Sequence, residues 1–321
     1  MELLVQSSIL FISLVALVKS SQFVIDSALK IARMTKLESL VIGFILLSVT
    51  TSLPELAVSF SAITSGEVNI SIGNILGSNI TNIGLCVGLI AIIAPLTIKV
   101  TRKELANISS ILFLSSLIPL LLLTLGGISR IVGSILIFIF MYFCFFSIRK
   151  KMMLKEKYYF VIKSSLIKAF IILFIGLICL IVSSKFIVDS AAKLAQIVGI
   201  TESFIGATII ALGTSLPELS VSLESLKRGQ VNLALGNAIG SCLTNLTLIL
   251  GIILIVSPFA IDMHIFSTLL TFVVITSLLM WHFLSDAKIQ LTDGIILLFV
   301  YIIFLVASFG VQVGLLEILR T

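Results

Sequence analysis

Residues 50–56 read TTSLPEL and residues 213–219 read GTSLPEL, and each stretch puts a proline and a glutamate inside a long apolar segment. Proline lacks a backbone N–H, and its ring clashes with the carbonyl four residues earlier, so it breaks or kinks a helix. An Asp in the middle of a membrane costs roughly 2.5–3.5 kcal/mol, and we expect a comparable cost for Glu. Two such stretches therefore predict two broken helices whose glutamates have a ligand that compensates this cost.

The composition predicts an integral membrane protein. The chain has 321 residues, of which 59% are hydrophobic and only 11% are charged, and its mean hydropathy is +1.27. A soluble domain carries roughly 25% charged residues, so this chain has too few to cover a surface that faces water.

Apolar segments of about 20 residues are typical of membrane-spanning helices. We predict an all-α integral membrane protein with ten transmembrane helices, at residues 3–20, 40–64, 70–95, 105–125, 128–148, 165–184, 203–226, 233–257, 261–284 and 290–316. The first span lacks a basic n-region and a small-residue cleavage site, so we expect no cleaved targeting peptide.

The chain contains an internal repeat at an offset of 163 residues. The matched stretches are SSQFVIDSALK (20–30) with SSKFIVDSAAK (183–193), the two SLPEL motifs, and GNILGSNITN (73–82) with GNAIGSCLTN (236–245). Each repeat holds five predicted spans, an odd number, so the second enters the membrane in the opposite sense. Inverted repeats of this kind are typical of secondary transporters, whose site lies near the midplane at broken helices.

This repeat divides the chain into a first five-helix repeat (1–148), a basic cytoplasmic linker (149–164) and an inverted second repeat (165–321). Lys and Arg favour cytoplasmic loops. If the N-terminus is outside, most of the 21 Lys and Arg residues fall in cytoplasmic loops. We therefore predict a multi-pass protein of the cell membrane with both termini outside. The cluster RKKMMLKEK (149–157) fits a topology anchor, and contact with acidic lipid headgroups is the less favoured alternative.

Hydroxyl and carboxylate oxygens share one helix face beside each proline. Thr51 lies four residues before Glu55 and Ser52 lies three before it, so their side chains point the same way on a helix. In the next span Ser78 and Asn82 are also four residues apart. The corresponding positions in the second half are Thr214, Ser215, Glu218, Ser241 and Asn245.

The prolines also predict main-chain carbonyls without helical partners, around residues 48–50 and 211–213. At membrane depth such carbonyls are tolerated only where protein buries them or where they line a wet cavity. Carboxylate, hydroxyl, amide and carbonyl oxygens suit hard cations such as Ca²⁺, Mg²⁺ or Na⁺. The two carboxylates are neutralised by one divalent cation, by two sodium ions or by two protons, so these ions would compete for one set of oxygens. The pairs Gly73 with Gly77 and Gly236 with Gly240 would let the helix backbones approach closely.

Each feature also has a purely structural interpretation. SLPE fits a capping box at the start of a helix, although apolar sequence continues on both sides, and a helix that begins at mid-depth is itself a broken helix. Asn82 and Asn245 could serve only as interhelical hydrogen-bonding groups. Asp26 and Asp189 are matched by the repeat but lie in amphipathic stretches, which favours a solvated interfacial face over a role in ion entry.

On TTSLPEL with GNILGSN and GTSLPEL with GNAIGS, the chain resembles the cation/calcium antiporter superfamily, in particular its sodium/calcium exchanger-like prokaryotic members. The resemblance covers both repeats. It implies ten helices in two inverted repeats, and Ca²⁺ extrusion driven by inward flow of a monovalent cation. It also implies that the first and sixth helices slide across the rest of the molecule.

The resemblance implies ion ligands at Thr51, Ser52, Glu55, Ser78 and Asn82, at Thr214, Ser215, Glu218, Ser241 and Asn245, and at the main-chain carbonyls of Ser48 and Ala211. Two positions depart from the family pattern. Many sodium/calcium exchangers have Asp where this chain has Asn245. The proton-coupled branch of the family, like this chain, lacks that carboxylate. Thr50 stands where the second motif has Gly213.

We therefore predict a secondary active antiporter that exchanges Ca²⁺ for Na⁺ by alternating access at a central two-glutamate site. The alternative is exchange of H⁺ for Ca²⁺ or another divalent cation at the same site. A channel would show uncoupled flux, and an enzyme is not expected because GxSxG, HExxH and DDxxD motifs are missing from the sequence. The expected partners are the transported cations and membrane lipids, with no cofactor, no nucleic acid and no obligate protein partner.

Overall fold

The computed structural model describes residues 1–34, 47–93, 110–117, 129–149, 166–227, 229, 231–257, 263–285 and 289–318, and these residues are almost entirely helical. Seven of the described helical segments are long and apolar enough to cross a membrane. The prediction of an all-α membrane protein is confirmed. Nearly all of the predicted linker (149–164) and parts of the predicted spans 40–64 and 105–125 lie outside the described residues.

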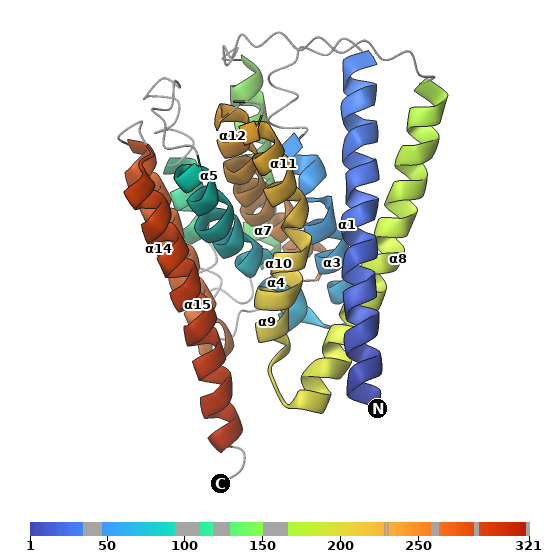
Figure 1. Ribbon diagram of the computed structural model, residues 1–321, viewed down its shortest axis with the longest axis vertical. Helices are drawn as coiled ribbons and strands as arrows, with labels where there is room; N and C mark the ends of the chain where they lie inside the picture. Colours follow the sequence, from blue (N-terminus) through green and yellow to red (C-terminus); the bar gives the residue numbers. More distant parts are fainter. Residues whose placement is uncertain are drawn as a thin grey trace.

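The two longest helices lie side by side at one flank of the molecule (Figure 1). They are α1 (Glu2–Met34) and α8 (Leu166–Val198), each of 33 residues. At 1.5 Å per residue each is about 50 Å long, well beyond the roughly 30 Å of a bilayer's hydrocarbon core. Both helices extend well beyond the C-terminal ends of the predicted spans 3–20 and 165–184. The polar residues that follow them contain no Gly or Pro to end the helix, so both helices continue.

Both proline motifs break a helix, as predicted. Residues 47–51 are helical, Ser52 forms a turn, and α3 (Leu53–Thr64) starts with Pro54 in its first turn. In the second half, α9 (Glu202–Ile205), a π-helical turn η2 (Gly206–Ile210) and α10 (Ala211–Thr214) precede a turn at Ser215, after which α11 (Leu216–Lys227) begins.

Two further segments cross the centre of the molecule, and each contains a π-helical turn that the sequence analysis did not predict. The first comprises α4 (Val68–Thr81), η1 (Asn82–Val87) and α5 (Gly88–Ile93). The second comprises α12 (Val231–Leu243), η3 (Thr244–Ile249) and α13 (Leu250–Val256). Such turns are rare in proteins as a whole, and those that do occur are often found at functional sites.

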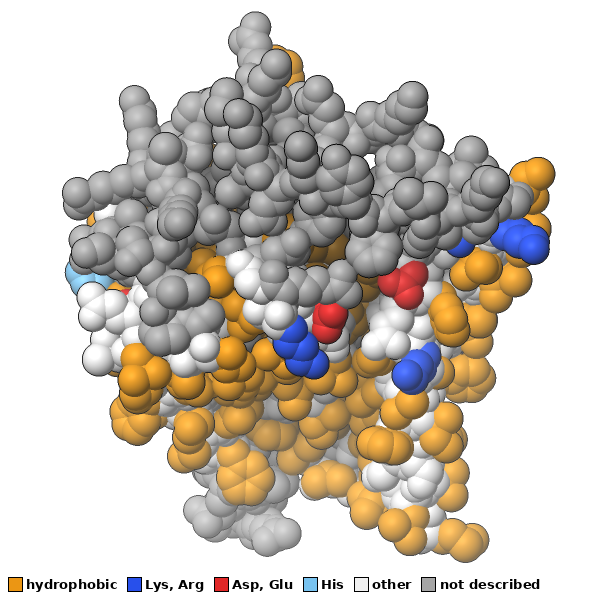
Figure 2. Space-filling model, turned by 45° about the horizontal axis from the view of Figure 1, so that its top comes forward, with side chains coloured by type: hydrophobic (Ala, Val, Ile, Leu, Met, Phe, Trp, Pro, Cys, Tyr) orange, Lys and Arg blue, Asp and Glu red, His pale blue; other side chains and the backbone are white. Residues whose placement is uncertain are grey.

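The remaining long helices are α7 (Ser129–Arg149), α14 (Met263–Ser285) and α15 (Leu291–Ile318). α14 and α15 lie at the flank opposite α1 and α8 (Figure 1). Large apolar side chains are exposed on α7, α8 and α15, for example Phe138, Phe174 and Phe299 respectively. Figure 2 shows hydrophobic side chains over much of one face, with charged side chains gathered toward one end. This pattern is that of a surface in contact with lipid.

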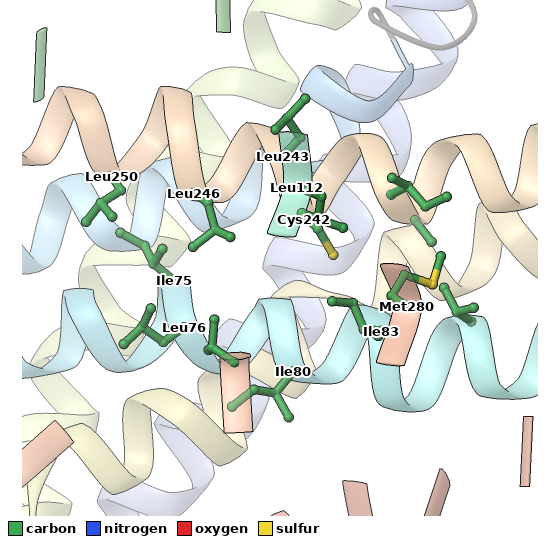
Figure 3. Packing of buried hydrophobic residues seen from close by; sticks show 14 of the residues in the cluster. Ile75, Leu76, Ile80, Ile83, Leu112, Cys242, Leu243, Leu246, Leu250 and Met280 are labelled. Atoms are coloured by element: carbon green, nitrogen blue, oxygen red, sulfur yellow. The ribbon is translucent and has the colours of Figure 1, made fainter. Parts of the chain in front are cut away.

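Apolar side chains join the two central segments to each other (Figure 3). Ile75, from α4, lies near Leu246 and Leu250, from η3 and α13, and all three are almost completely buried. The core therefore combines side chains from both halves of the sequence. It holds α4 and α12 in fixed positions beside the two broken helices.

Candidate cation site

The two motif glutamates are buried and are linked through serines of the opposite motif. Ser215 Oγ donates a hydrogen bond to Glu55 Oε1, and Ser52 Oγ donates one to Glu218 Oε1, each at 3.3 Å. Both glutamate side chains are 0% exposed. Each keeps its second carboxylate oxygen, Oε2, without a hydrogen-bond partner. Two carboxylate oxygens are therefore free to accept a ligand in the interior of the protein.

The predicted hydroxyl ligands meet across the two halves. Thr51 Oγ1 lies 3.1 Å from Ser241 Oγ, and Ser78 Oγ lies 3.3 Å from Thr214 Oγ1. All four side chains are fully buried. Each contact therefore joins a hydroxyl beside one proline break to a hydroxyl on the central helix of the other half, so the structure brings these predicted residues together around the glutamates.

The carbonyls of Ser48 and Ala211 are not bare, which corrects part of the prediction. Each accepts an ordinary helical bond, from Ser52 N and Ser215 N respectively, at 3.1 Å. The missing N–H of a proline removes the partner of the residue four positions earlier. For Pro54 that residue is Thr50 rather than Ser48. The Ser48 and Ala211 oxygens each have a second lone pair, to which a threonine hydroxyl can donate at 3.2 Å, Thr51 at Ser48 and Thr214 at Ala211. Ser241 Oγ also lies 3.5 Å from Ser48 O.

The two predicted amide ligands lie in the π-helical turns and have few partners. Asn82 begins η1, and its Oδ1 lies 3.7 Å from Cys86 Sγ, whereas its Nδ2 has no partner. Asn245 lies within η3, and neither of its side-chain polar atoms has a hydrogen-bond partner. Both residues are 0% exposed. An unpartnered buried amide is costly, so both side chains retain capacity for a ligand.

Sequence analysis missed two asparagines that tie the halves together. Asn74 Nδ2 donates to the main-chain oxygen of Glu55 at 3.3 Å, and Asn74 Oδ1 accepts from Thr214 Oγ1 at 3.1 Å. Asn237 makes the same pair of bonds with Glu218 O at 3.3 Å and Thr51 Oγ1 at 3.2 Å. The signal was present in the sequence. Both residues are asparagines at matched repeat positions, four residues before the predicted serines.

Glycines set the close approach of the first half to the second. A Cβ on Gly73 would lie 2.6 Å from the main-chain oxygen of Ser203, and a Cβ on Gly77 would overlap the backbone of Ala207. A Cβ on Gly206 would likewise lie 2.7 Å from Ile70 O. The predicted small-residue contact is confirmed for Gly73 and Gly77. It brings α4 directly against α9 and η2.

The structure argues against the capping interpretation of Ser52 and agrees with the interfacial interpretation of Asp189. Ser52 occupies the N-cap of α3 but makes no side-chain capping bond, because its hydroxyl is directed to Glu218. Asp189 is exposed, as expected for an interfacial side chain. Within the described part of the chain, no cluster of three or more His, Cys, Asp or Glu side chains could hold a metal. A cation between the glutamates would therefore rely on hydroxyl, amide and carbonyl oxygens as well as carboxylates.

Comparison with known proteins gives a consistent result. The family described as sodium/calcium exchanger protein matches residues 6–149 and 168–310. The uncharacterized membrane protein MJ0091 of Methanocaldococcus jannaschii is 34% identical over 88% of this chain and 91% of its own length. The sodium/calcium exchanger MaX1 of Methanosarcina acetivorans is 28% identical over 94% of this chain and 97% of its own.

Among solved structures, the sodium-calcium exchanger NCX_Mj soaked with Na⁺ and Sr²⁺ matches with a TM-score of 0.65 and 31% sequence identity. The match covers 94% of this chain and 98% of that one. The inner membrane protein YrbG of Escherichia coli is 31% identical over 87% of this chain and 90% of its own length. The fold is thus that of a multi-pass membrane transporter, and the chain belongs to the sodium/calcium exchanger family of cation antiporters.

Proposed function

We propose that the protein exchanges Ca²⁺ for Na⁺ across the cell membrane by alternating access at the site between Glu55 and Glu218. The observation that carries this proposal is the reciprocal pair of bonds from Ser215 to Glu55 and from Ser52 to Glu218. These bonds orient two buried carboxylates, each with one oxygen left for a ligand. Together they carry a charge of −2, which one Ca²⁺ or two Na⁺ would neutralise.

The proposed ligands extend outward from the glutamates. In the first half they are Ser48 through its carbonyl, Thr51, Ser52, Ser78 and Asn82, and in the second half they are Ala211 through its carbonyl, Thr214, Ser215, Ser241 and Asn245. Ca²⁺ takes about 6–8 oxygen ligands, so the ion would use part of this set. Because Na⁺ also prefers oxygen, the two ions would compete for the same atoms, and competition is what couples their movements.

The proposed architecture is ten transmembrane helices in two inverted five-helix repeats, 1–148 and 165–321, joined by the basic linker 149–164. The hydrogen bonds support it, because those of Ser52, Glu55 and Asn74 recur at positions 163 residues later. Alternating access would follow from exchanging the roles of the two halves. α1 begins and α15 ends at the same end of the molecule (Figure 1), which supports placing both termini on one side of the membrane; the distribution of Lys and Arg is the reason for proposing that this side is the outside.

Exchange of H⁺ for Ca²⁺ is a second candidate, favoured by one observation. Asn245 is neutral, and its side chain has no hydrogen-bond partner, so the site has only two carboxylates with which to bind monovalent cations. Two protons on Glu55 and Glu218 would balance the charge of one departing Ca²⁺ as well as two Na⁺ would.

A flux assay in proteoliposomes separates the two functions. We expect Ca²⁺ uptake when Na⁺ is loaded inside and the pH gradient is collapsed by an ionophore. Uptake that needs a pH gradient and ignores Na⁺ would establish proton exchange instead. Ca²⁺ movement without any counter-ion would indicate a channel and would contradict both proposals.

A further inference from the structure

The side-chain amide of Asn74 has only one orientation that suits its neighbours. Its Nδ2 faces Glu55 O at 3.3 Å and Ser59 Oγ at 3.0 Å. A main-chain oxygen can only accept, so the donor end of the amide must face Glu55. Oδ1 therefore faces Thr214, and the Thr214 hydroxyl must donate its proton in that contact.

Asn237 repeats this arrangement in the other half. Its Nδ2 faces Glu218 O at 3.3 Å and Ser222 Oγ at 3.5 Å, and its Oδ1 faces Thr51 Oγ1. Ser59 and Ser222 are themselves matched by the repeat. Each asparagine thus binds a glutamate backbone in its own half and a threonine in the opposite half.

Each threonine has one proton and three oxygen neighbours: a serine hydroxyl, which can donate or accept, and two oxygens that can only accept. Thr214 Oγ1 lies 3.1 Å from Asn74 Oδ1 and 3.2 Å from Ala211 O in its own helix. Threonines within helices commonly donate to a carbonyl three or four residues earlier. If Thr214 did so, its proton would occupy the second lone pair of the Ala211 carbonyl, since Ser215 N already uses the first.

We infer that Asn74 and Asn237 are positioning residues that accept the threonine protons and so leave threonine and carbonyl lone pairs for the cation. This inference rests on the proposed ion site. A cation repels the positive end of a hydroxyl, so the proton must turn away from the ion. The acceptor of the Thr214 proton is Asn74 Oδ1, which belongs to the opposite half of the molecule. Cation binding therefore strengthens a bond between the halves through Asn74 and, by symmetry, Asn237.

The test is Ca²⁺ binding to the purified full-length protein, measured by calorimetry with the Asn74→Ala variant. Residues that orient metal ligands typically contribute about 10–100-fold to affinity, and we expect a loss of that size. The matched control is Asn79→Ala. Asn79 lies on the same helix, is also 0% exposed, and donates to Ile75 O of its own helix at 2.8 Å. It should lower thermal stability yet leave Ca²⁺ affinity within about threefold.

A double-mutant cycle tests whether Asn74 acts through the Thr214 hydroxyl. A purely structural role of Asn74 would not depend on that hydroxyl. After Thr214→Val has removed the hydroxyl, adding Asn74→Ala should weaken Ca²⁺ binding by much less than it does alone. Thr214→Ser keeps the hydroxyl and should retain the full effect of Asn74→Ala. If Asn74→Ala does not fold, the same cycle is performed with Asn237 and Thr51.

The outcomes separate the inference from the proposed function. Unchanged Ca²⁺ affinity in Asn74→Ala, or fully additive effects in the cycle, would overturn the inference alone. Wild-type protein that binds Ca²⁺ but exchanges it for no cation would overturn the proposed function and leave the inference standing. Wild-type protein that binds no Ca²⁺ would overturn both.

Discussion

The two broken-helix regions of this protein make the same central contacts but differ at their edges. The bonds from Ser52 to Glu218 and from Ser215 to Glu55 have equal lengths, and so do those from the two asparagines to the glutamate backbones. Two fully buried carboxylates therefore have equivalent surroundings. The duplicated part of the site is the part that would hold a divalent cation.

The two halves differ at residues that surround this central pair of glutamates. Asn82 contacts Cys86, whereas Asn245 has no hydrogen-bond partner, and the residue that matches Cys86 is an isoleucine. Thr50 is buried in the first motif, whereas a Cβ on Gly213 would lie 2.5 Å from Leu14 Cδ2 of α1. The two halves therefore differ at the amides of the π-helical turns and at the contact with α1, and agree where the two glutamates meet.

The largest expected effect tests the equivalence of the glutamates. Glu55→Gln and Glu218→Gln should each reduce Ca²⁺ flux to background in proteoliposomes, because either change leaves a charge of −1 facing a +2 ion. Glu224→Gln, on the exposed surface of α11, is the control and should retain flux. If one of the two site variants transports Ca²⁺ at the wild-type rate, the halves are not equivalent.

The next effect compares the two amides. Asn245→Asp should change the concentration of monovalent cation that gives half-maximal exchange, by about tenfold if one extra interaction is worth about 1.4 kcal/mol. Asn82→Asp should change it less, because Cys86 already contacts the Asn82 oxygen. Dose–response curves for Na⁺ and for H⁺ measure both. Identical curves for wild type and Asn245→Asp would argue against a ligand at that position.

A third comparison concerns the glycines behind the site. Gly77→Ala should destabilise the folded protein by about 1–3 kcal/mol, as inserted methyl groups do in tightly packed interiors, because its Cβ would overlap Ala207. Gly240→Ala should cost as much if the second half has the matching contact. Gly310→Ala is the control, since nothing lies within 4 Å of its Cβ position. Thermal unfolding in detergent would reveal any inequality between Gly77 and Gly240.

A smaller effect is expected at the edge formed with α1. Gly213→Ala would place its methyl group against the Leu14 side chain, which can relieve the clash by leaving its preferred rotamer at about 0.5–1.5 kcal/mol. Exchange should slow by a few fold, and Leu14→Ala in the same protein should restore it. If the double variant is as slow as the single one, the contact with Leu14 is not the cause.

The smallest effect concerns Glu67, whose matched position in the second half is Gln230. Burial, then repulsion from Glu202, raises the pKa of Glu67 above its usual 4.5. The folded protein therefore holds this proton to a higher pH than the unfolded chain, so folded stability falls as the pH rises from 4.5 toward the raised pKa. Glu67→Gln should raise Tm slightly at neutral pH and leave it unchanged below pH 4.5. A lower Tm of Glu67→Gln than of the wild type at neutral pH would show that ionised Glu67 stabilises the fold, contrary to this prediction.

The sequence predicted the parts of this structure that depend on local chemistry. Proline at positions 54 and 217 was enough to place both helix breaks. Helical spacing put Thr51, Ser52 and Glu55 on one face, whereas the helix breaks at Ser52, and the hydroxyls of Thr51 and Ser52 contact residues of the second half. Gly73 and Gly77 predicted a close helix contact, although not that its partner would be a π-helical turn.

The parts that depend on tertiary structure were beyond the reach of sequence reasoning. The partner of each glutamate is a serine from the other motif, and only the folded protein brings Ser215 to Glu55. The repeat matches Asn74 with Asn237 but Asn79 with Cys242, which separates the two asparagines in the sequence; which helix each one faces is visible only in the folded protein. The π-helical turns at Asn82 and Thr244 likewise have no period that a pattern of apolar residues would reveal.

The most direct test of the central claim is anomalous diffraction from crystals soaked in Ca²⁺ or Sr²⁺. We predict one strong peak bounded by the carboxylates of Glu55 and Glu218 in the wild-type protein, and its loss in Glu55→Gln crystals soaked in the same way. An ordered wild-type structure with no peak between these carboxylates, or with the divalent ion bound elsewhere in the molecule, would contradict the account.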